Sequence, residues 1–204
     1  MALLRGLFMY LVPGANPTTQ RLVREDELTH ITLVPVPSAE AAGAVAAELL
    51  ASEGIDLIEL YGGLGPKAAA KVLAATGDGA VPVGLIGVEY SAPEGNIATV
   101  FAAAGADPAT DRWVFEHEAG RVSVVAVPSP AEAASAAEKL VAEGADRIEV
   151  CGGMGAAPAT EVMAAIGDRV PVSAVLYGFE SLPAVAAYRA RFEAAAGELS
   201  GFSG

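Results

Sequence analysis

The chain contains one sequence pattern twice, and this internal repeat limits the possible folds more than any other feature. The segment PGANPTTQRLVREDE (13–27) aligns with AGADPATDRWVFEHE (104–118), and EGIDLIELYGGLG (53–65) aligns with EGADRIEVCGGMG (143–155). VPV at 81–83 recurs at 170–172, so the register drifts by only about one residue either way. Two copies of this length do not make a solenoid, which needs shorter and more numerous repeats, so the chain is a tandem duplication of one folding unit.

A fused pair of this kind is most simply derived from a protein that associated about a two-fold axis, the commonest arrangement of dimers. We therefore expect a first α/β repeat over residues 1–92 and a second over 93–180, related by pseudo-two-fold symmetry. A C-terminal helix and tail should follow over 181–204. The junction SAPEGN (91–96) favours a turn because it contains Pro, Gly and Asn. The chain should be a monomeric pseudo-dimer or a homodimer.

Strand and helix patterns alternate within each copy. HITLVPVP and RVSVVAVP predict buried strands, whereas QRLVRE and DRWVFEHE alternate in polarity and predict an edge strand. Strands that alternate with helices imply right-handed crossovers and mainly parallel sheets. The expected fold class is α/β, with two tandem homologous β-β-α-β-α-β units and a C-terminal helix that starts near Ser181.

Charge and composition argue against several classes of partner. The net charge of −13 disfavours nucleic acid and anionic membrane surfaces, both of which attract Lys and Arg clusters. No apolar run reaches the roughly 20 residues of a membrane-spanning helix. The N-terminal MALLRGLFMYLVPGA has the composition of a signal peptide, but it aligns with a segment deep inside the chain and is predicted to be a strand. Cys151 is the single cysteine, so no internal disulfide can form, which fits a cytoplasmic protein.

A glycine-rich turn, GGxG, follows a strand in each copy. Ligands bind at such strand-to-helix turns in open parallel sheets, and backbone N–H groups at a helix start attract anions. The pattern is neither the dinucleotide-binding G-x-G-x-x-G nor a P-loop, so it assigns no cofactor. The alternative is a tight turn that lets helix and strand approach closely.

Two glutamates, Glu59 and Glu149, lie inside apolar strands just before these turns. A buried carboxylate must be partnered, protonated or directed into a cavity, because burying an unpaired charge is costly. Arg21 and Arg112 are repeated as well and are candidate partners. The pairs could form structural ion pairs between the copies, or the carboxylates could act as ligand anchors or a general base.

Other polar residues give weaker indications. His30 and His117 do not align with each other, so neither belongs to a site present in both copies. Cys151 is expected to pack rather than to act as a nucleophile. The Glu-x-Glu pairs on the predicted edge strands fit a solvated face, and no metal site is expected.

The run DLIELYGGLGP…AAAKVLAATG…VPVG, preceded by VPVPS and an Ala/Glu-rich helix, resembles an uncharacterised bacterial family of short α/β proteins classed as a domain of unknown function. The signature is the strand-Glu-x-x-Gly-Gly segment, which begins here at Glu59 and at Glu149. The family usually appears as a single copy, so this chain differs in being doubled. The resemblance implies a fold but no activity, substrate or catalytic residue.

Two functions fit these features. The first is an α/β protein that binds a small polar or anionic metabolite at pseudo-symmetric sites on the GGxG turns. The second is a non-catalytic scaffold or partner-binding protein in which the repeated residues serve only the fold and the interface. The first is favoured, because an acid just before a glycine turn is poor packing material. The ligand-binding candidates are Glu59, Gly62, Gly63, Gly65, Arg21, Glu149, Gly152, Gly153, Gly155 and Arg112.

Overall fold

The computed structural model describes residues 3–77, 79–87 and 94–201, and the predicted boundary at 92–93 lies outside these ranges. The first half contains β1 (Leu4–Leu11), β2 (Leu22–Glu25), β3 (Thr29–Val36), α1 (Ala39–Glu53), β4 (Leu57–Tyr61), α2 (Pro66–Thr76) and β5 (Val83–Leu85). The second half repeats this order with β6 (Gly95–Ala102), β7 (Arg112–His117), β8 (Gly120–Val127), α3 (Ala133–Ala142), β9 (Arg147–Val150), α4 (Ala156–Ile166) and β10 (Val172–Ala174). It continues into β11 (Leu176–Tyr177) and α5 (Leu182–Gly201), and it includes the short 3-10 helices η1 (Pro130–Glu132), η2 (Gly152–Met154), η3 (Gly167–Arg169) and η4 (Phe179–Ser181).

The α/β class, the duplication and the C-terminal helix are therefore confirmed. Each unit has one strand more than the expected β-β-α-β-α-β order, because three strands precede its first long helix. The extra strand is the short edge strand, β2 or β7, which the polar alternation did predict.

Each half forms its own mainly parallel sheet. The first sheet has the order β11-β5-β4-β1-β3-β2, and the second has the order β10-β9-β6-β8-β7. β2 and β7 pair antiparallel at corresponding edges, next to β3 and β8. The other neighbours within each repeat are parallel.

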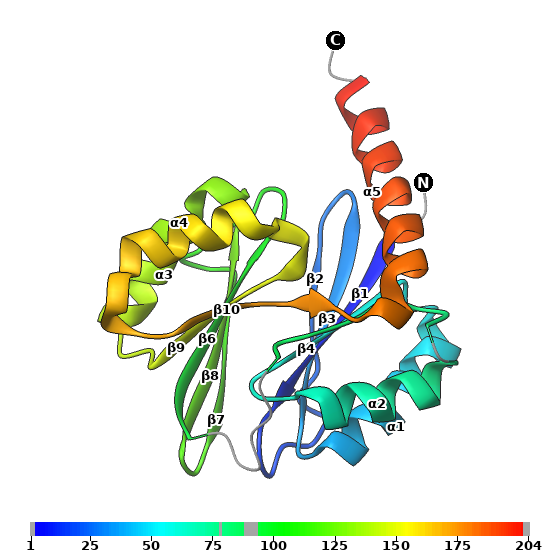
Figure 1. The fold of residues 1–204 in the computed structure, drawn as a ribbon, viewed down its shortest axis with the longest axis horizontal. Coiled ribbons are helices and arrows are strands. Elements are labelled where there is room, and N and C mark those ends of the chain that lie inside the picture. The colour runs from blue at the N-terminus through cyan, green and yellow to red at the C-terminus, as the bar shows by residue number, and fades with distance from the viewer. Residues whose placement is uncertain (1–2, 78, 88–93, 202–204) are drawn as a thin grey trace.

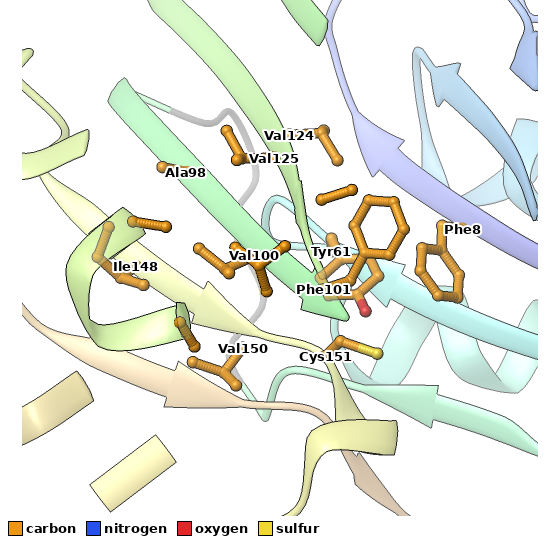
Figure 2. Close-up of a cluster of buried hydrophobic side chains, with 14 of the residues drawn as sticks. Phe8, Tyr61, Ala98, Val100, Phe101, Val124, Val125, Ile148, Val150 and Cys151 are labelled. Carbon is orange, nitrogen blue, oxygen red and sulfur yellow. The ribbon is translucent and has the colours of Figure 1, made fainter. Parts of the chain in front are cut away.

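The two sheets pack face to face, and the helices cover their outer surfaces (Figure 1). The inner surfaces meet through aromatic side chains: the ring centroids of Phe8 and Phe101 are 5.5 Å apart, and those of Tyr10 and Phe115 are 5.9 Å apart. Figure 2 shows Phe8, Tyr61 and Phe101 together in this buried layer. The molecule is thus a helix–sheet–sheet–helix sandwich whose central layer joins the two repeats.

The residues on the outer face of the first sheet follow from the alternation of side-chain direction along its strands. Leu7 and Met9 point away from Phe8 and pack in one buried cluster with Leu49 of α1 and Val72 of α2. Helix α1 begins at the N-cap Ser38, whose side chain accepts a hydrogen bond from the Ala41 N–H. These local signals are present in the sequence, which is why the repeat pattern predicted the elements well.

One strand crosses between the repeats. β11 belongs to the second repeat by sequence, yet it pairs antiparallel with β5 at the edge of the first sheet, with Tyr177 opposite Gly84. The chain then enters α5, which extends away from the sheets (Figure 1). Ser181 anchors this connection, because its hydroxyl accepts a hydrogen bond from the Val83 N–H at 3.2 Å. Among the described residues, no helix is long and apolar enough to cross a membrane.

Candidate functional site

Glu59 lies in a row of side chains that crosses the inner face of the first sheet. In the strand register it sits between Phe8 on β1 and Gly84 on β5, and Gly84 in turn lies opposite Tyr177 on β11. A Cβ atom on Gly84 would lie 2.5 Å from Val175 Cγ1 and 2.9 Å from the Tyr177 ring. The missing side chain at Gly84 therefore leaves the space through which Tyr177 reaches Glu59.

The Glu59 carboxylate is wholly buried and fully bonded. The Tyr177 hydroxyl donates to Oε1 at 2.5 Å, and the Tyr61 hydroxyl donates to Oε2. The Cys151 thiol and the Gly152 N–H of the second repeat also bond to this carboxylate. Burial raises the pKa of Glu59, and these four donors partly offset the rise.

Glu149 makes the reciprocal contact from the second sheet. It is also wholly buried, and its Oε2 accepts a hydrogen bond from the Gly62 N–H of the first repeat at 2.9 Å. Burial raises the pKa of Glu149 to about 7, against the opposing effects of the Gly62 N–H, the nearby Arg147 charge and the Thr99 hydroxyl. Each glutamate therefore reaches the glycine turn of the other repeat, which is the arrangement that pseudo-two-fold symmetry requires.

The two glutamates differ in how completely they are bonded. Oε1 of Glu149 and the hydroxyl of Tyr10 are buried and have no hydrogen-bond partner within the described part of the chain, whereas the hydroxyl of Thr99 acts on the Glu149 carboxylate and lowers its pKa. Thr99 is the strand neighbour of Glu149, just as Phe8 is the strand neighbour of Glu59. Tyr10 faces them from the first sheet, where its ring stacks on Tyr61 at a centroid distance of 5.1 Å.

Tyr10 lies within electrostatic reach of this acidic cluster. Burial is the main cause that raises its pKa above the usual value, and the charges of Cys151, Glu149 and Glu59 add to the rise. Beside Glu149 the second repeat has the small Thr99 where the first repeat has Phe8 beside Glu59.

Gly152 allows the two halves to approach closely, whereas Gly62 allows a close approach to β1 within its own repeat. A Cβ atom on Gly152 would lie 2.9 Å from Glu59 Oε1, and one on Gly62 would lie 3.1 Å from the Leu11 nitrogen. Gly62 and Gly63 also have positive φ angles of 68° and 92°, which side chains rarely adopt. Gly65 and Gly155 serve as the N-caps of α2 and α4, and Gly153 lies beside Cys151 Sγ, 3.7 Å from where its own Cβ would be.

Arg21 and Arg112 do not pair with the buried glutamates. Arg21 Nη2 bonds Glu48 Oε1 at 2.9 Å, and Arg112 Nη2 bonds Glu143 Oε2 at 2.5 Å. Arg21 directly precedes β2 and Arg112 is the first residue of β7, and their guanidinium groups reach acids of α1 and of the segment after α3. The structure therefore replaces the expected ion pairs between repeats with hydrogen bonds from tyrosine hydroxyls, a thiol and backbone amides.

Cys151 packs between the sheets, as predicted, and Figure 2 shows it beside Phe101 and Tyr61. Burial raises the pKa of its thiol, and the charge of Glu59 raises it further, so the thiol stays protonated. Within the described ranges, no group of three or more His, Cys, Asp or Glu side chains could hold a metal ion.

Repeat-based reasoning missed several residues of the inner layer. Tyr177 comes from the crossing strand, and Thr99 takes the place that Phe8 has in the first repeat. Arg24, which corresponds to Phe115, is buried on β2 and donates to the Ala104 carbonyl oxygen of the second repeat at 2.8 Å. None of these residues is repeated, so the comparison of the two copies gave no signal for them.

The sequence matches the family described as "Family of unknown function (DUF6506)" twice, over residues 4–98 and 95–190. The chain belongs to DUF6506. Two successive matches confirm that this DUF6506 chain is a tandem duplication, and they agree with the resemblance in its strand-Glu-x-x-Gly-Gly segments. A search of curated proteins finds no match.

Solved structures show only a distant likeness to this DUF6506 protein. The ABC domain in complex with L-Trp from Streptococcus pneumonia is 14% identical with a TM-score of 0.29, and the match covers 88% of this chain and 76% of that one. CD0873, a substrate-binding protein with adhesive properties from Clostridium difficile, is 12% identical with a TM-score of 0.30, over 84% and 74%. A conserved domain protein from Vibrio cholerae is 10% identical with a TM-score of 0.31, over 100% and 86%. TM-scores this low carry no argument about function.

Proposed function

We propose that this protein binds a small polar molecule between its two repeats, in contact with Tyr10, Thr99 and Glu149. The observation that carries the proposal is that the Tyr10 hydroxyl and Oε1 of Glu149 are buried without a hydrogen-bond partner in the described structure. A buried polar group left unbonded costs about 1–3 kcal/mol, so native proteins rarely keep several together without a reason. A ligand that bonds both atoms would recover that cost.

The position of these residues supports the same proposal. Tyr10 is next to the last residue of β1, and Glu149 is next to the last residue of β9, in parallel sheets. Open parallel sheets bind ligands at the carboxyl ends of their strands. The Gly62 turn lies directly beside Glu149, because its N–H donates to the carboxylate.

On this proposal the protein has one binding site rather than two matched sites. Glu59 is already bonded by Tyr61, Tyr177 and groups of the second repeat, so it has no free acceptor to offer. Glu149 keeps one oxygen free, and the small Thr99 beside it takes less space than Phe8 takes beside Glu59. On this proposal Glu59 has a structural role and Glu149 has the binding role.

A scaffold function is the second candidate, and a separate observation favours it. The Gly62–Glu149 and Gly152–Glu59 contacts cross the interface in both directions, and β11 completes the sheet of the other repeat. These contacts alone would account for acids at both positions. On this second proposal the cluster holds the repeats together and binds no ligand.

The experiment that separates the two candidates is a thermal-shift screen of a library of small polar metabolites. We expect at least one compound to raise the Tm of the wild-type protein and to lose most of that effect in Thr99→Val. The matched control is Thr32→Val, because the Thr32 hydroxyl is also buried but Thr32 pairs with Leu7 on the helix-covered face of the first sheet. A screen without hits, or hits that survive Thr99→Val unchanged, would favour the scaffold.

A further inference from the structure

The outer strands β10 and β11 belong to an uncharged stretch of the chain. Each of them lies at the end of its sheet, and the residues 170–179 (VPVSAVLYGF) that contain both include no Asp, Glu, Lys or Arg. Figure 1 shows this stretch crossing the molecule from the end of α4 to the start of α5. The strands at the other ends of the two sheets, β2 and β7, carry charged side chains, which commonly protect a free sheet edge from other chains.

Phe179 projects from one end of this stretch. It is 89% exposed, more than any other large apolar residue in the described part of the chain. Leu176 on β11 and Leu182 at the start of α5 are exposed as well. Exposed apolar side chains that gather in one region mark a surface that binds a partner, because isolated ones are the rule on a monomer.

A hollow of about 450 Å³ lies at the other end of the same stretch. α4, η3 and β10 and the residues between them supply its lining, which consists of Met163, Gly167, Asp168, Val170, Pro171 and Val172. Met163 is itself exposed, and its sulfur is of a kind that packs favourably against aromatic rings. The hollow therefore offers apolar contacts to a side chain such as phenylalanine.

The charged residues next to these two features have opposite signs. Glu180 follows Phe179 and is exposed, whereas Arg169 lies beside the hollow and is exposed too. The ion pair of Arg169 with Glu138 is 3.7 Å long and joins two half-exposed side chains, so Arg169 can turn to a second acid. Arg169 also offsets Asp168, the one acid in the lining of the hollow.

We propose that this face binds a second copy of the chain about a two-fold axis, with Phe179 of each copy in the hollow of the other. One such axis makes both contacts at once, because each copy carries the side chain and the hollow on the same stretch. It also brings Glu180 of each copy toward Arg169 of the other. Two copies with a net charge of −13 repel each other, so they approach best where the surface is uncharged.

This inference does not depend on the proposed binding of a small molecule. The contact is small and relies on one aromatic anchor, so the dimer should be weak. At low micromolar concentrations the chain should be monomeric. At concentrations near millimolar it should be mostly dimeric.

Sedimentation velocity of the intact chain over this range of concentrations tests the proposal. We expect a reversible equilibrium between monomer and dimer, and we expect Phe179→Ala to weaken it by at least about tenfold, because the variant lacks the aromatic anchor. Met163→Glu places an acid in the hollow and should weaken the dimer to a similar degree. The control is Val23→Ala, which shortens an exposed apolar side chain on β2 and should leave the equilibrium unchanged.

A mixture of the two weakened variants gives a second readout. In a mixed dimer, Phe179 of the Met163→Glu chain meets the unaltered hollow of the Phe179→Ala chain, so one of the two contacts is restored. Association should therefore be stronger in the mixture than in either variant alone, and circular dichroism checks that both variants keep the fold. The proposal would be overturned by a chain that stays monomeric throughout, by a dimer that Phe179→Ala leaves unchanged, or by a mixture that associates no better than its components.

Discussion

At the scale of single residues, Glu59 and Glu149 occupy equivalent positions but have different surroundings. Tyrosine hydroxyls, a thiol and a backbone amide surround Glu59, whereas one backbone amide, a nearby arginine and the Thr99 hydroxyl act on Glu149. The difference comes from side chains that the duplication did not preserve, namely Phe8 against Thr99 and Tyr61 against Cys151. Equivalent acids can therefore be tested separately.

We predict opposite effects for two tyrosine substitutions. Tyr177→Phe removes a donor to the buried Glu59 carboxylate and should lower the free energy of unfolding by about 1–3 kcal/mol. Tyr10→Phe removes a buried hydroxyl that has no partner within the described residues, so it should be neutral or slightly stabilising. Urea denaturation of both variants checks the prediction, and equal losses would contradict it.

Stability should also depend on pH through Glu149. Its pKa rises from 4.5 to about 7 on folding, so the folded chain holds this proton more tightly than the unfolded chain. The contribution of Glu149 to stability is then greatest below pH 4.5, falls as the pH rises to 7, and levels off above that. Between pH 5 and pH 8 the loss should be about 2–3 kcal/mol, and Glu59, whose pKa is also raised, should add to it.

Glu149→Gln provides the control for this pH dependence. Glutamine keeps an acceptor for the Gly62 N–H but does not titrate, so the decline between pH 5 and pH 8 should become shallower. Chemical denaturation at several pH values measures both chains. A decline of the same size in the variant would show that other groups cause it.

At the scale of elements, the sequence predicted what depends on local patterns and missed what depends on the partner sheet. Alternating polarity identified the edge strands β2 and β7, and Ser38 and Gly54 mark the ends of α1. The segment Leu176–Tyr177 has no such pattern, because two residues are too few to show alternation. Its pairing is decided by the edge of β5 and by the contact between Tyr177 and Glu59. These two residues lie 118 positions apart in the chain.

The site was predictable to the same degree. The burial of Glu59 and Glu149 followed from the apolar strands around them, and their place between the copies followed from the repeat. Their hydrogen-bond partners did not follow, since Tyr177 and Gly152 approach Glu59 only after the sheets have packed. Arg21 and Arg112 were expected as partners because they were repeated, but repetition alone does not bring side chains together.

The crossing of β11 can be tested at Gly84. Gly84→Ala would place a methyl group 2.5 Å from Val175 Cγ1 and 2.9 Å from the Tyr177 ring. We expect a loss of about 1–3 kcal/mol from this overpacking. Gly197→Ala in α5 is the control, because a Cβ atom there meets nothing within 4 Å, and it should stabilise the helix by up to about 1 kcal/mol. Differential scanning calorimetry of the two variants should give Tm shifts of opposite sign.

At the scale of the whole molecule, the two repeats share one buried layer. The faces that meet through Phe8, Phe101, Tyr10 and Phe115 would both be exposed to water in isolated halves. A linker between the halves raises their effective concentration but adds no contact of its own. The interface should therefore form without a covalent connection.

We predict that residues 1–92 and 93–204, produced as separate chains, associate on mixing into a one-to-one complex with the mass of the intact chain. Size-exclusion chromatography with light scattering measures the mass, and NMR spectra of each half before and after mixing report folding. Each half alone should aggregate or give poorly dispersed spectra. Two well-folded monomers that do not associate on mixing would contradict the prediction that the repeats depend on a shared buried layer.

The pairing of β11 with the sheet of the other repeat has a consequence for the history of the fold. In a protein made of one such unit, the same segment could complete a sheet only by passing into another molecule. Two subunits bound in this way would be intertwined. They could dissociate only after that strand had separated from the sheet of the other subunit. Gene fusion would then have turned a slow encounter between molecules into an event within a single chain.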